Sequence, residues 1–190
     1  MYNKVRHSGN MGEKLVSSYL CMLPSSSFRV YNNVMFRTKK GTTQIDHLVV
    51  SDRGIYVIET KAHKGKIYGN ATSKYWTQLL YGVGGKVNKF NFYSPYYQNR
   101  GHLKNVIKIL GTQSICGIIC FTSESVDLSG VYCESVFPLY LLNQVMLNIY
   151  VQAPMPDYNF YDMCRRVESL NIQSAYFDRK HVNYVKSLRG

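Results

Sequence analysis

Asp46, Glu59 and Lys61 are ionisable residues in a segment whose other residues are mostly apolar. The segment contains two runs rich in Val, Ile and Tyr, residues 43–50 and 55–61, with a polar break ending in glycine between them. This pattern predicts two antiparallel strands joined by a tight turn. An acid on each strand and a lysine shortly after the second acid could then meet at the end of the hairpin away from the turn.

The register of this hairpin follows if the turn closes symmetrically about its centre. Asp46 then lies directly opposite Glu59, and Gln44 lies opposite Lys61. Because strand side chains alternate between faces, all four share one face with the apolar residues nearer the turn, Leu48, Val50, Ile55 and Val57. Two carboxylates about 5 Å apart repel by roughly 3 kcal/mol at an effective dielectric constant of about 20. Some positive charge must offset this repulsion.

Two arrangements could supply that charge. Lys61 alone could do so in a structural ion-pair network with both acids. A divalent cation fits better, because Mg²⁺ is typically held by one or two carboxylates and leaves its other positions to water and phosphate. Lys61 could then reach the same water or phosphate. The group would have the parts of a centre that cleaves phosphodiester bonds.

Four short motifs occur in order along the chain: Gly12-Glu13, Ile45-Asp46-His47, Ile58-Glu59-Thr60-Lys61 and Pro95-Tyr96-Tyr97-Gln98. This ordered set resembles the nuclease-related domain (NERD) branch of the PD-(D/E)-x-K nuclease superfamily, and the resemblance covers roughly residues 10–120. Ile45 stands where the general superfamily pattern has proline, which this branch commonly lacks.

The resemblance implies a function and a set of site residues. The function is metal-dependent hydrolysis of phosphodiester bonds in nucleic acid by a nuclease or endonuclease, with Mg²⁺ or Mn²⁺ as cofactor. The implied metal ligands are Asp46, Glu59 and the peptide carbonyl of Thr60. The implied catalytic residues are Glu13, Asp46, Glu59, Lys61 and Gln98. The rival interpretations are a nucleic-acid-binding module that keeps the nuclease fold without turnover and a protein-interaction scaffold.

The charge distribution indicates an anionic partner. The chain has a net charge of +12, and residues 60–123 contain nine Lys or Arg and no Asp or Glu. A solvated basic face is the alternative, but this basic segment adjoins the paired carboxylates, which favours nucleic acid over a membrane surface. DNA is the favoured partner. The residues expected to bind it are Lys64, Lys66, Lys74, Lys86, Lys89, Arg100, Lys104 and Lys108.

The composition is that of one folded domain spanning residues 1–190, with a nuclease core at about 10–122 and C-terminal elements at about 130–190. The apolar runs are too short to cross a bilayer, and no signal peptide follows Met1, so we expect a cytoplasmic protein. The five cysteines show no Cys-x-x-Cys pair and predict neither a disulfide framework nor a zinc site. A homodimer is possible on this evidence.

The remaining patterns predict the elements that would position the motifs: a helix over 12–23, a strand over 28–36, a smaller hairpin within 65–80, a helix from Ser94 to Gly111 and a buried strand over 115–121. With the central hairpin, the order is helix, three strands, helix, strand. That order is the core of the α/β, restriction-endonuclease-like fold that the resemblance implies, a mixed central sheet flanked by helices. A strand over 131–135 and helices over 139–150 and 157–170 would complete it.

Three segments allow more than one interpretation. Glu13 could belong to the site or could form a capping box with Asn10 at a helix start. His102 shares a helix face with Gln98, but a single histidine on an apolar face is more often a core residue. The glycine-rich sequence of residues 82–86 predicts a flexible loop. The segment 88–93 that follows is both basic and aromatic. It could hold phosphates and stack bases, or its aromatic side chains could cover a small core.

Overall fold

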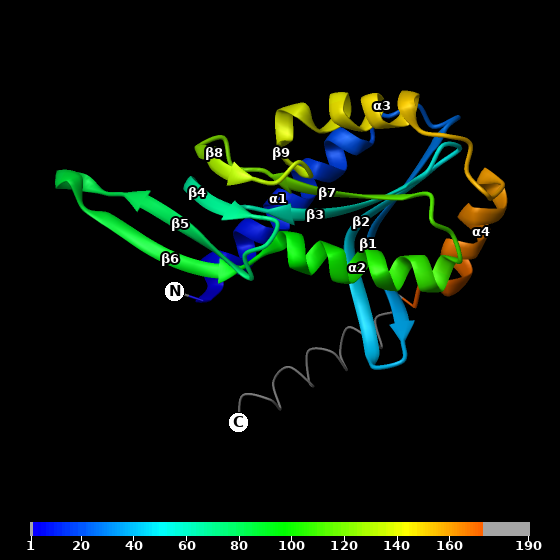
Figure 1. Ribbon diagram of the computed structural model, residues 1–190, viewed down its shortest axis with the longest axis horizontal. Helices are drawn as coiled ribbons and strands as arrows, with labels where there is room; N and C mark the ends of the chain where they lie inside the picture. Colours follow the sequence, from blue (N-terminus) through cyan, green and yellow to red (C-terminus); the bar gives the residue numbers. More distant parts are fainter. Residues whose placement is uncertain (1, 173–190) are drawn as a thin grey trace.

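The computed structural model describes the backbone of residues 2–172 and the side chains of residues 11–172 (Figure 1). The C-terminal stretch 173–190, which the sequence assigns to the same domain, lies outside the described residues. The described elements are α1 (Tyr2–Leu20), β1 (Phe28–Thr38), β2 (Gly41–Ser51), β3 (Ile55–Lys61), β4 (Gly65–Asn70), β5 (Tyr75–Tyr81), η1 (Val83–Gly85), β6 (Val87–Tyr93), α2 (Pro95–Leu110), β7 (Ile115–Phe121), β8 (Val126–Tyr132), β9 (Val136–Pro138), η2 (Leu139–Leu141), α3 (Leu142–Gln152) and α4 (Phe160–Leu170).

The main sheet has the strand order β1-β2-β3-β7-β9 and is covered by helices on both faces (Figure 1). Strands β1, β2 and β3 are antiparallel neighbours, whereas β7 runs parallel to β3 and β9 runs parallel to β7. Apolar residues of α2 and α4 pack on one face, and those of α1 and α3 pack on the other. Within residues 2–172 the protein is therefore an α/β structure with four α-helices and two mixed sheets.

The central hairpin has the predicted register. His47 pairs with Ile58, and the pairing continues to Val50 with Ile55 next to the turn. The ladder ends at His47–Ile58, so Asp46 and Glu59 lie just beyond its last pair. The apolar half of the predicted face is confirmed, because Leu48, Val50, Ile55 and Val57 belong to one buried cluster.

The prediction that Gln44 shares this face is wrong. Gln44 is exposed, whereas its neighbours Thr43 and Ile45 are buried. The change of face occurs opposite Asn33, which interrupts β1 with a left-handed backbone at φ 53°. Asparagine tolerates this conformation better than most residues. The interruption shifts the alternation, so the strand presents Thr43 rather than Gln44 to α2.

Helix α1 begins earlier than the sequence indicated and ends earlier, at Leu20 instead of Leu23. Because the helix already includes residue 10, Asn10 is not its N-cap, and the capping-box interpretation of Glu13 is wrong. The predicted apolar stripe is confirmed, since Val16 and Leu20 are fully buried. Leu23 is buried as well, although it follows the helix.

Helix α2 has the predicted ends. Ser94 is the N-cap and accepts a hydrogen bond from the amide of Tyr97, and Pro95 occupies the first helical position. Gly111 ends the helix in a left-handed conformation at φ 71°, and its amide donates to the carbonyl of Ile107. None of the described helices is long and apolar enough to span a membrane.

The second sheet has the strand order β6-β5-β4-β8 and projects from the body of the molecule as an arm (Figure 1). The hairpin of β4 and β5 was predicted, although its pairing is shifted, with Tyr68 opposite Thr77. The segment 87–93 forms strand β6 instead of continuing the predicted loop, and the strand predicted at 131–135 lies at 126–132 as β8. The helices predicted at 139–150 and 157–170 correspond to η2 with α3 and to α4.

Candidate active site

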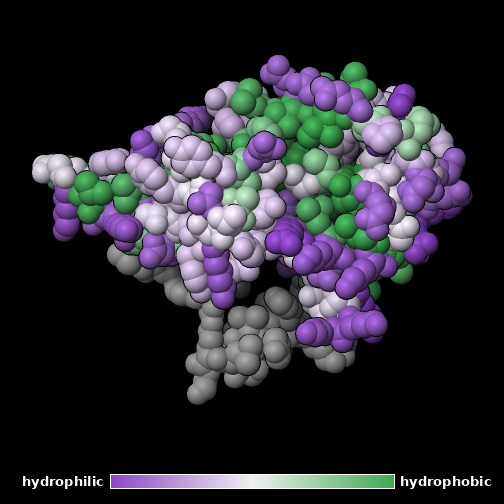
Figure 2. All heavy atoms as spheres, in the orientation of Figure 1, coloured by the Kyte–Doolittle hydropathy of each residue, from purple (hydrophilic) through white to green (hydrophobic). Residues whose placement is uncertain are grey.

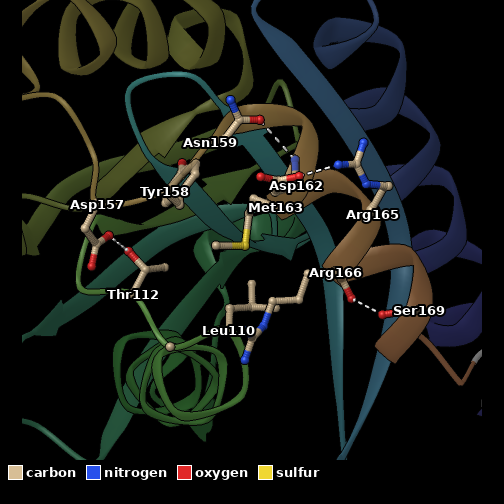
Figure 3. A pocket seen from close by; sticks show the side chains of 11 residues that line it. Leu110, Thr112, Asp157, Tyr158, Asn159, Asp162, Met163, Arg165, Arg166 and Ser169 are labelled. Atoms are coloured by element: carbon tan, nitrogen blue, oxygen red, sulfur yellow. Dashed lines mark hydrogen bonds and ion pairs between the residues drawn. The ribbon is translucent and has the colours of Figure 1, made fainter.

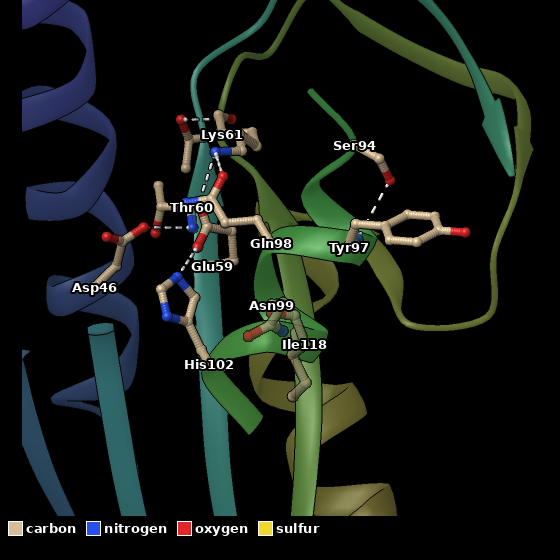
Figure 4. Close-up of polar contacts among 11 residues, drawn as sticks. Asp46, Glu59, Thr60, Lys61, Ser94, Tyr97, Gln98, Asn99, His102 and Ile118 are labelled. Atoms are coloured by element: carbon tan, nitrogen blue, oxygen red, sulfur yellow. Dashed lines mark hydrogen bonds and ion pairs between the residues drawn. The ribbon is translucent and has the colours of Figure 1, made fainter. Parts of the chain in front are cut away.

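The candidate site forms where the ladder between β2 and β3 ends. Strand β3 continues beyond Ile58 with its other edge still paired to β7, so its edge facing β2 has no ladder partner there. The side chain of Asp46 takes that place: its Oδ2 accepts a hydrogen bond of 2.9 Å from the amide of Thr60 (Figure 4). The end of the ladder thus brings a carboxylate of β2 to the last residues of β3.

Glu59 lies at the centre of the group and is only 2% exposed. Lys61 Nζ donates to Glu59 Oε1 at 2.5 Å and to Gln98 Oε1 at 3.1 Å. Gln98 comes from the first turn of α2, so the lysine joins that helix to β3 (Figure 4). Asp46, Glu59, Lys61 and Gln98, four of the residues predicted from the sequence, are therefore brought together by β2, β3 and α2.

His102 belongs to the same group, contrary to its expected place in the core. Its Nε2 lies 3.6 Å from Glu59 Oε2, and its Nδ1 lies 2.9 Å from the hydroxyl of Thr43. The sequence carried a signal for this, because His102 follows Gln98 by one helical turn on the same face. Thr43 could not have been found in that way, since the interruption at Asn33 determines which face it occupies.

Asn99 fixes the position of α2 against the sheet and was not predicted. It is buried, and its Nδ2 donates to the carbonyl of Val57 on β3 at 3.1 Å and to that of Ile118 on β7 at 3.0 Å. One side chain thus bridges α2 to two neighbouring strands. Gln98 and His102 are carried on the helix that this contact holds in place.

Gly12 and Glu13 approach the site from α1. A Cβ atom at Gly12 would lie 2.7 Å from Thr122 Oγ1 and 3.4 Å from Thr60 Cγ2, so glycine allows the helix to pack closely against the end of β3. The neighbouring Glu13 is close enough to Asp46 for the charge of Asp46 to raise its pKa. The Gly-Glu motif therefore joins the other motifs in space.

Burial raises the pKa values of the three carboxyl groups, and the charge of Asp46 adds to the shifts of Glu59 and Glu13. The pKa of Glu59 is raised to about 7, chiefly by burial and also by the charges of Asp46 and Glu13, against the opposing effect of Lys61. Burial also raises the pKa of Asp46, although the hydrogen bond from Thr60 opposes the shift, and burial is the largest cause of the raised pKa of Glu13. Burial lowers the pKa of His102. Because the surroundings of the three carboxyl groups favour the neutral acids, a positive charge beside these groups would favour the ionised carboxylates.

The oxygen atoms of this group suit a hard divalent cation. In the described part of the chain, no three His, Cys, Asp or Glu side chains form a complete metal-binding cluster. One or two carboxylates are nevertheless the usual protein contribution to a Mg²⁺ site, and water and substrate phosphate occupy its other positions. In an extended strand the amide and the carbonyl of one residue point to the same side of the strand. The amide of Thr60 donates to Asp46, so the carbonyl of Thr60 points to the side on which Asp46 lies. Asp46, Glu59 and this carbonyl therefore fit the ion.

The eight basic residues predicted to bind nucleic acid lie on the arm and on α2. Those on or next to the arm are Lys64, Lys66, Lys74, Lys86 and Lys89, and those on α2 are Arg100, Lys104 and Lys108. All are exposed except Lys66, whose Nζ lies 3.6 Å from Asp127 Oδ2 on β8. Figure 2 shows hydrophilic side chains gathered over α2.

Other hollows of the surface lie away from the carboxylates. One cavity of about 640 Å³ lies between the end of α2 and the start of α4, where Thr112 donates to Asp157 at 2.5 Å (Figure 3). Arg166 at the same cavity donates to the carbonyl of Ile109 at 3.1 Å. These contacts hold the two helices together. A smaller cavity of about 350 Å³ adjoins the site on the α1 side and is lined by Glu13, Asn33 and His47 among others.

Three comparisons relate the chain to known proteins. An uncharacterized protein of Bacillus anthracis is 30% identical over 181 residues, which cover 93% of this chain and 83% of that protein. A solved structure, that of a protein of unknown function named AF1548, aligns over 95% of each chain at 12% identity with a TM-score of 0.35. The model of the nuclease-related domain family matches residues 8–122, the range that holds all four motifs. The chain therefore belongs to the nuclease-related domain (NERD) family.

Proposed function

We propose that this protein is a metal-dependent nuclease that hydrolyses phosphodiester bonds, with DNA as the first substrate to test. One observation carries the proposal: Asp46, Glu59, Lys61 and Gln98 come from three different elements and meet around one buried carboxylate. A structural ion pair would need only Lys61 and Glu59. The additional carboxylates, Asp46 and Glu13, raise the electrostatic energy of the group, which is a cost without a cation.

The arrangement of the elements supports the proposal. Helix α1 is followed by the antiparallel strands β1, β2 and β3, then by α2 and the parallel strand β7. We assign this succession to the restriction-endonuclease-like core, with the arm inserted between β3 and α2 and the elements from β8 onward added after β7. In this assignment the acids lie at the end of β3, where the hairpin ladder opens.

Each residue of the group has a role in the proposed reaction. Asp46, Glu59 and the carbonyl of Thr60 would hold Mg²⁺ or Mn²⁺, which when bound supplies Lewis acidity towards a water molecule and the phosphate. Lys61 would hold the attacking water or donate to a phosphate oxygen as negative charge develops there. Gln98 orients the lysine through its Oε1, and His102 Nε2 lies 3.6 Å from Glu59 Oε2.

The test is cleavage of plasmid, linear duplex, single-stranded DNA and RNA, each with Mg²⁺, with Mn²⁺ and with chelator. Asp46→Asn, Glu59→Gln and Lys61→Ala should each reduce cleavage by orders of magnitude while nucleic-acid binding survives. The matched control is Glu124→Gln, because Glu124 is an exposed carboxylate outside the group. Wild-type rates in all three site variants, or cleavage that ignores the chelator, would overturn the proposal.

A further inference from the structure

The arm carries a row of exposed tyrosines on one face. Its opposite face packs against the main sheet through Ile67, Trp76 and Phe92, which belong to one apolar cluster with Phe121 of β7. Strand alternation and pairing place four tyrosines on the outward face, because Tyr75 pairs with Tyr93, Tyr68 with Thr77 and Tyr81 with Val87. Phe90 pairs with Gln78 and lies on the same side of the sheet as Trp76. We call the outward face the tyrosine face, defined by Tyr68, Tyr75, Tyr81 and Tyr93.

These rings contribute little to the core. The four residues are 41%, 60%, 64% and 45% exposed, in chain order. Tyr75 and Tyr93 contact each other edge to face with ring centroids 6.2 Å apart, which leaves ring surface open to solvent. Exposed aromatic rings that gather on one sheet face differ from scattered surface residues, because exposed apolar groups of this kind mark binding sites.

The charges around the tyrosine face favour an anionic ligand. The strands of the second sheet contain a single carboxylate, Asp127 of β8, and Lys66 pairs with it at 3.6 Å. Lys89 lies on the tyrosine face opposite Leu79, and Lys86 precedes β6. Lys74 places its Nζ 5.8 Å from the centre of the Tyr75 ring. Exposed rings beside lysines are the combination that stacks bases while holding the phosphate backbone.

We propose that the tyrosine face binds unpaired nucleic acid, with bases stacked on its rings and the backbone held by the lysines of the arm. This proposal rests on the proposed function, since it names the class of substrate that would reach the candidate site. In a duplex the base faces already stack on one another, so an aromatic ring can reach them only where the strands are separated. The face therefore selects single strands or unpaired regions, whether of DNA or of RNA.

The chain connects this face directly to the candidate site. Strand β6 ends at Tyr93, and the next residue, Ser94, is the cap of α2. Gln98 in the first turn of α2 contacts Lys61 at 3.1 Å. Figure 1 shows the arm extending from the end of the main sheet where β3 stops. A strand lying along the tyrosine face would therefore be led towards the carboxylates.

The proposal is tested by fluorescence anisotropy with labelled single-stranded DNA, single-stranded RNA and duplex DNA of equal length, all in chelator so that no cleavage occurs. The variant Tyr75→Leu/Tyr93→Leu keeps apolar residues on the strands but removes the rings. It should weaken binding of single strands by about 5- to 150-fold for each stacked base lost. Duplex binding should change less than twofold. The variant Tyr75→Phe/Tyr93→Phe keeps the rings and should bind single strands as the wild type does.

The matched control replaces two exposed tyrosines outside the arm, Tyr140→Leu/Tyr161→Leu, and should leave all affinities unchanged. An equal loss for duplex and single strands, or no loss in the Leu variant, would overturn the proposal. These results are independent of the proposed function, which would fail instead if the Asp46→Asn, Glu59→Gln and Lys61→Ala variants all cleaved at the wild-type rate. DNA and RNA probes show whether the face distinguishes the two sugars.

Discussion

The amide of Thr60 donates to the carboxylate of Asp46 at the point where the ladder between their strands has ended. A side chain thus replaces the backbone partner that a longer β2–β3 ladder would have supplied. The contact holds Asp46 beside Glu59 although each carboxylate raises the energy of the other. It explains how two acids are held together where the ladder between β2 and β3 ends.

Asp46→Asn should therefore stabilise the metal-free protein or leave its stability unchanged. The asparagine Oδ1 can still accept from Thr60, and the substitution removes a charge that raises the pKa of Glu59. Melting curves in chelator should show a Tm no lower than that of the wild type. Mg²⁺ or Mn²⁺ at about 100 times its Kd should add about 2.7 kcal/mol of stability to the wild type and little to the variant.

The structural ion-pair interpretation forecasts a different outcome for the same two proteins. If Asp46 binds no cation, it serves as a partner for Lys61, so the Asp46→Asn variant would melt at a lower temperature than the wild type. Metal would then change neither melting curve. Glu124→Gln, at an exposed position, controls for the general effect of removing a carboxylate from this basic protein.

Gly12→Ala should damage both stability and activity. The new Cβ would lie 2.7 Å from Thr122 Oγ1, so α1 would have to move away from β3 and take Glu13 with it. Overpacking of this kind costs about 1 to 3 kcal/mol. Urea unfolding measures the loss, and a cleavage assay at saturating metal measures the effect on the site.

Gly101→Ala is the matched control for that substitution. Gly101 lies inside α2 with nothing within 4 Å of its added Cβ. Alanine there should stabilise the protein by about 0.5 to 1 kcal/mol, because glycine is a poor residue in a helix interior. If both variants were equally stable, close packing of α1 against β3 would not be the reason for glycine at position 12.

The sequence was most informative where local rules determine the structure. The register of β2 and β3 follows from a short turn and regular alternation, and the ends of α2 follow from Ser94, Pro95 and Gly111. Asp46, Glu59 and Lys61 could be placed together from the hairpin register, whereas Gln98 was assigned to the group through the family resemblance. Their predicted roles remain predictions until cleavage is measured.

Other features depend on contacts that are distant in sequence. Opposite the left-handed backbone of Asn33 on β1, Thr43 faces the site and Gln44 does not. The sequence of β2 alone gives no sign of this change of face. Strand β6 is exposed along most of its length, so burial does not impose the apolar alternation by which strands are recognised. The start of α1 before Asn10 shows that a plausible cap residue does not by itself begin a helix.

The basic residues of α2, as well as those of the arm, should contribute to the salt dependence of nucleic-acid binding. Arg100, Lys104 and Lys108 are exposed along one side of α2. If all three contact phosphates, replacing them with Ala should reduce the slope of log K against log salt by about 0.7 to 0.9 for each residue. Titrations at several salt concentrations measure this slope.

The control for this prediction is Lys39→Ala/Lys40→Ala in the exposed turn between β1 and β2. Its slope should stay within error of the wild-type value. A slope that is unchanged in the α2 variant as well would make the row on α2 an ordinary solvated face. A similar decrease in both variants would indicate that binding follows net charge and has no preferred surface.

The stability of the metal-free protein should fall as pH rises through the range in which Glu59 titrates. The pKa of Glu59 is raised from 4.5 to about 7 by burial, so the folded protein binds this proton more tightly than the unfolded chain does. The contribution is fully present below pH 4.5 and is lost as pH approaches 7, by an amount on the order of 3 kcal/mol. The raised pKa values of Asp46 and Glu13 act in the same direction.

The lowered pKa values of His47 and His102 act in the opposite direction, because the unfolded chain binds those protons more tightly. The difference between wild type and Glu59→Gln isolates the contribution of Glu59 from these histidines. In chelator, urea unfolding at pH 5 and pH 7.5 should show that the variant gains stability relative to the wild type as pH rises. Saturating Mg²⁺ should remove most of that relative gain, since the cation stabilises only the ionised carboxylate of the wild type. A difference that is constant with pH would mean that Lys61 alone keeps Glu59 ionised, and the argument for a cation at this position would then be wrong.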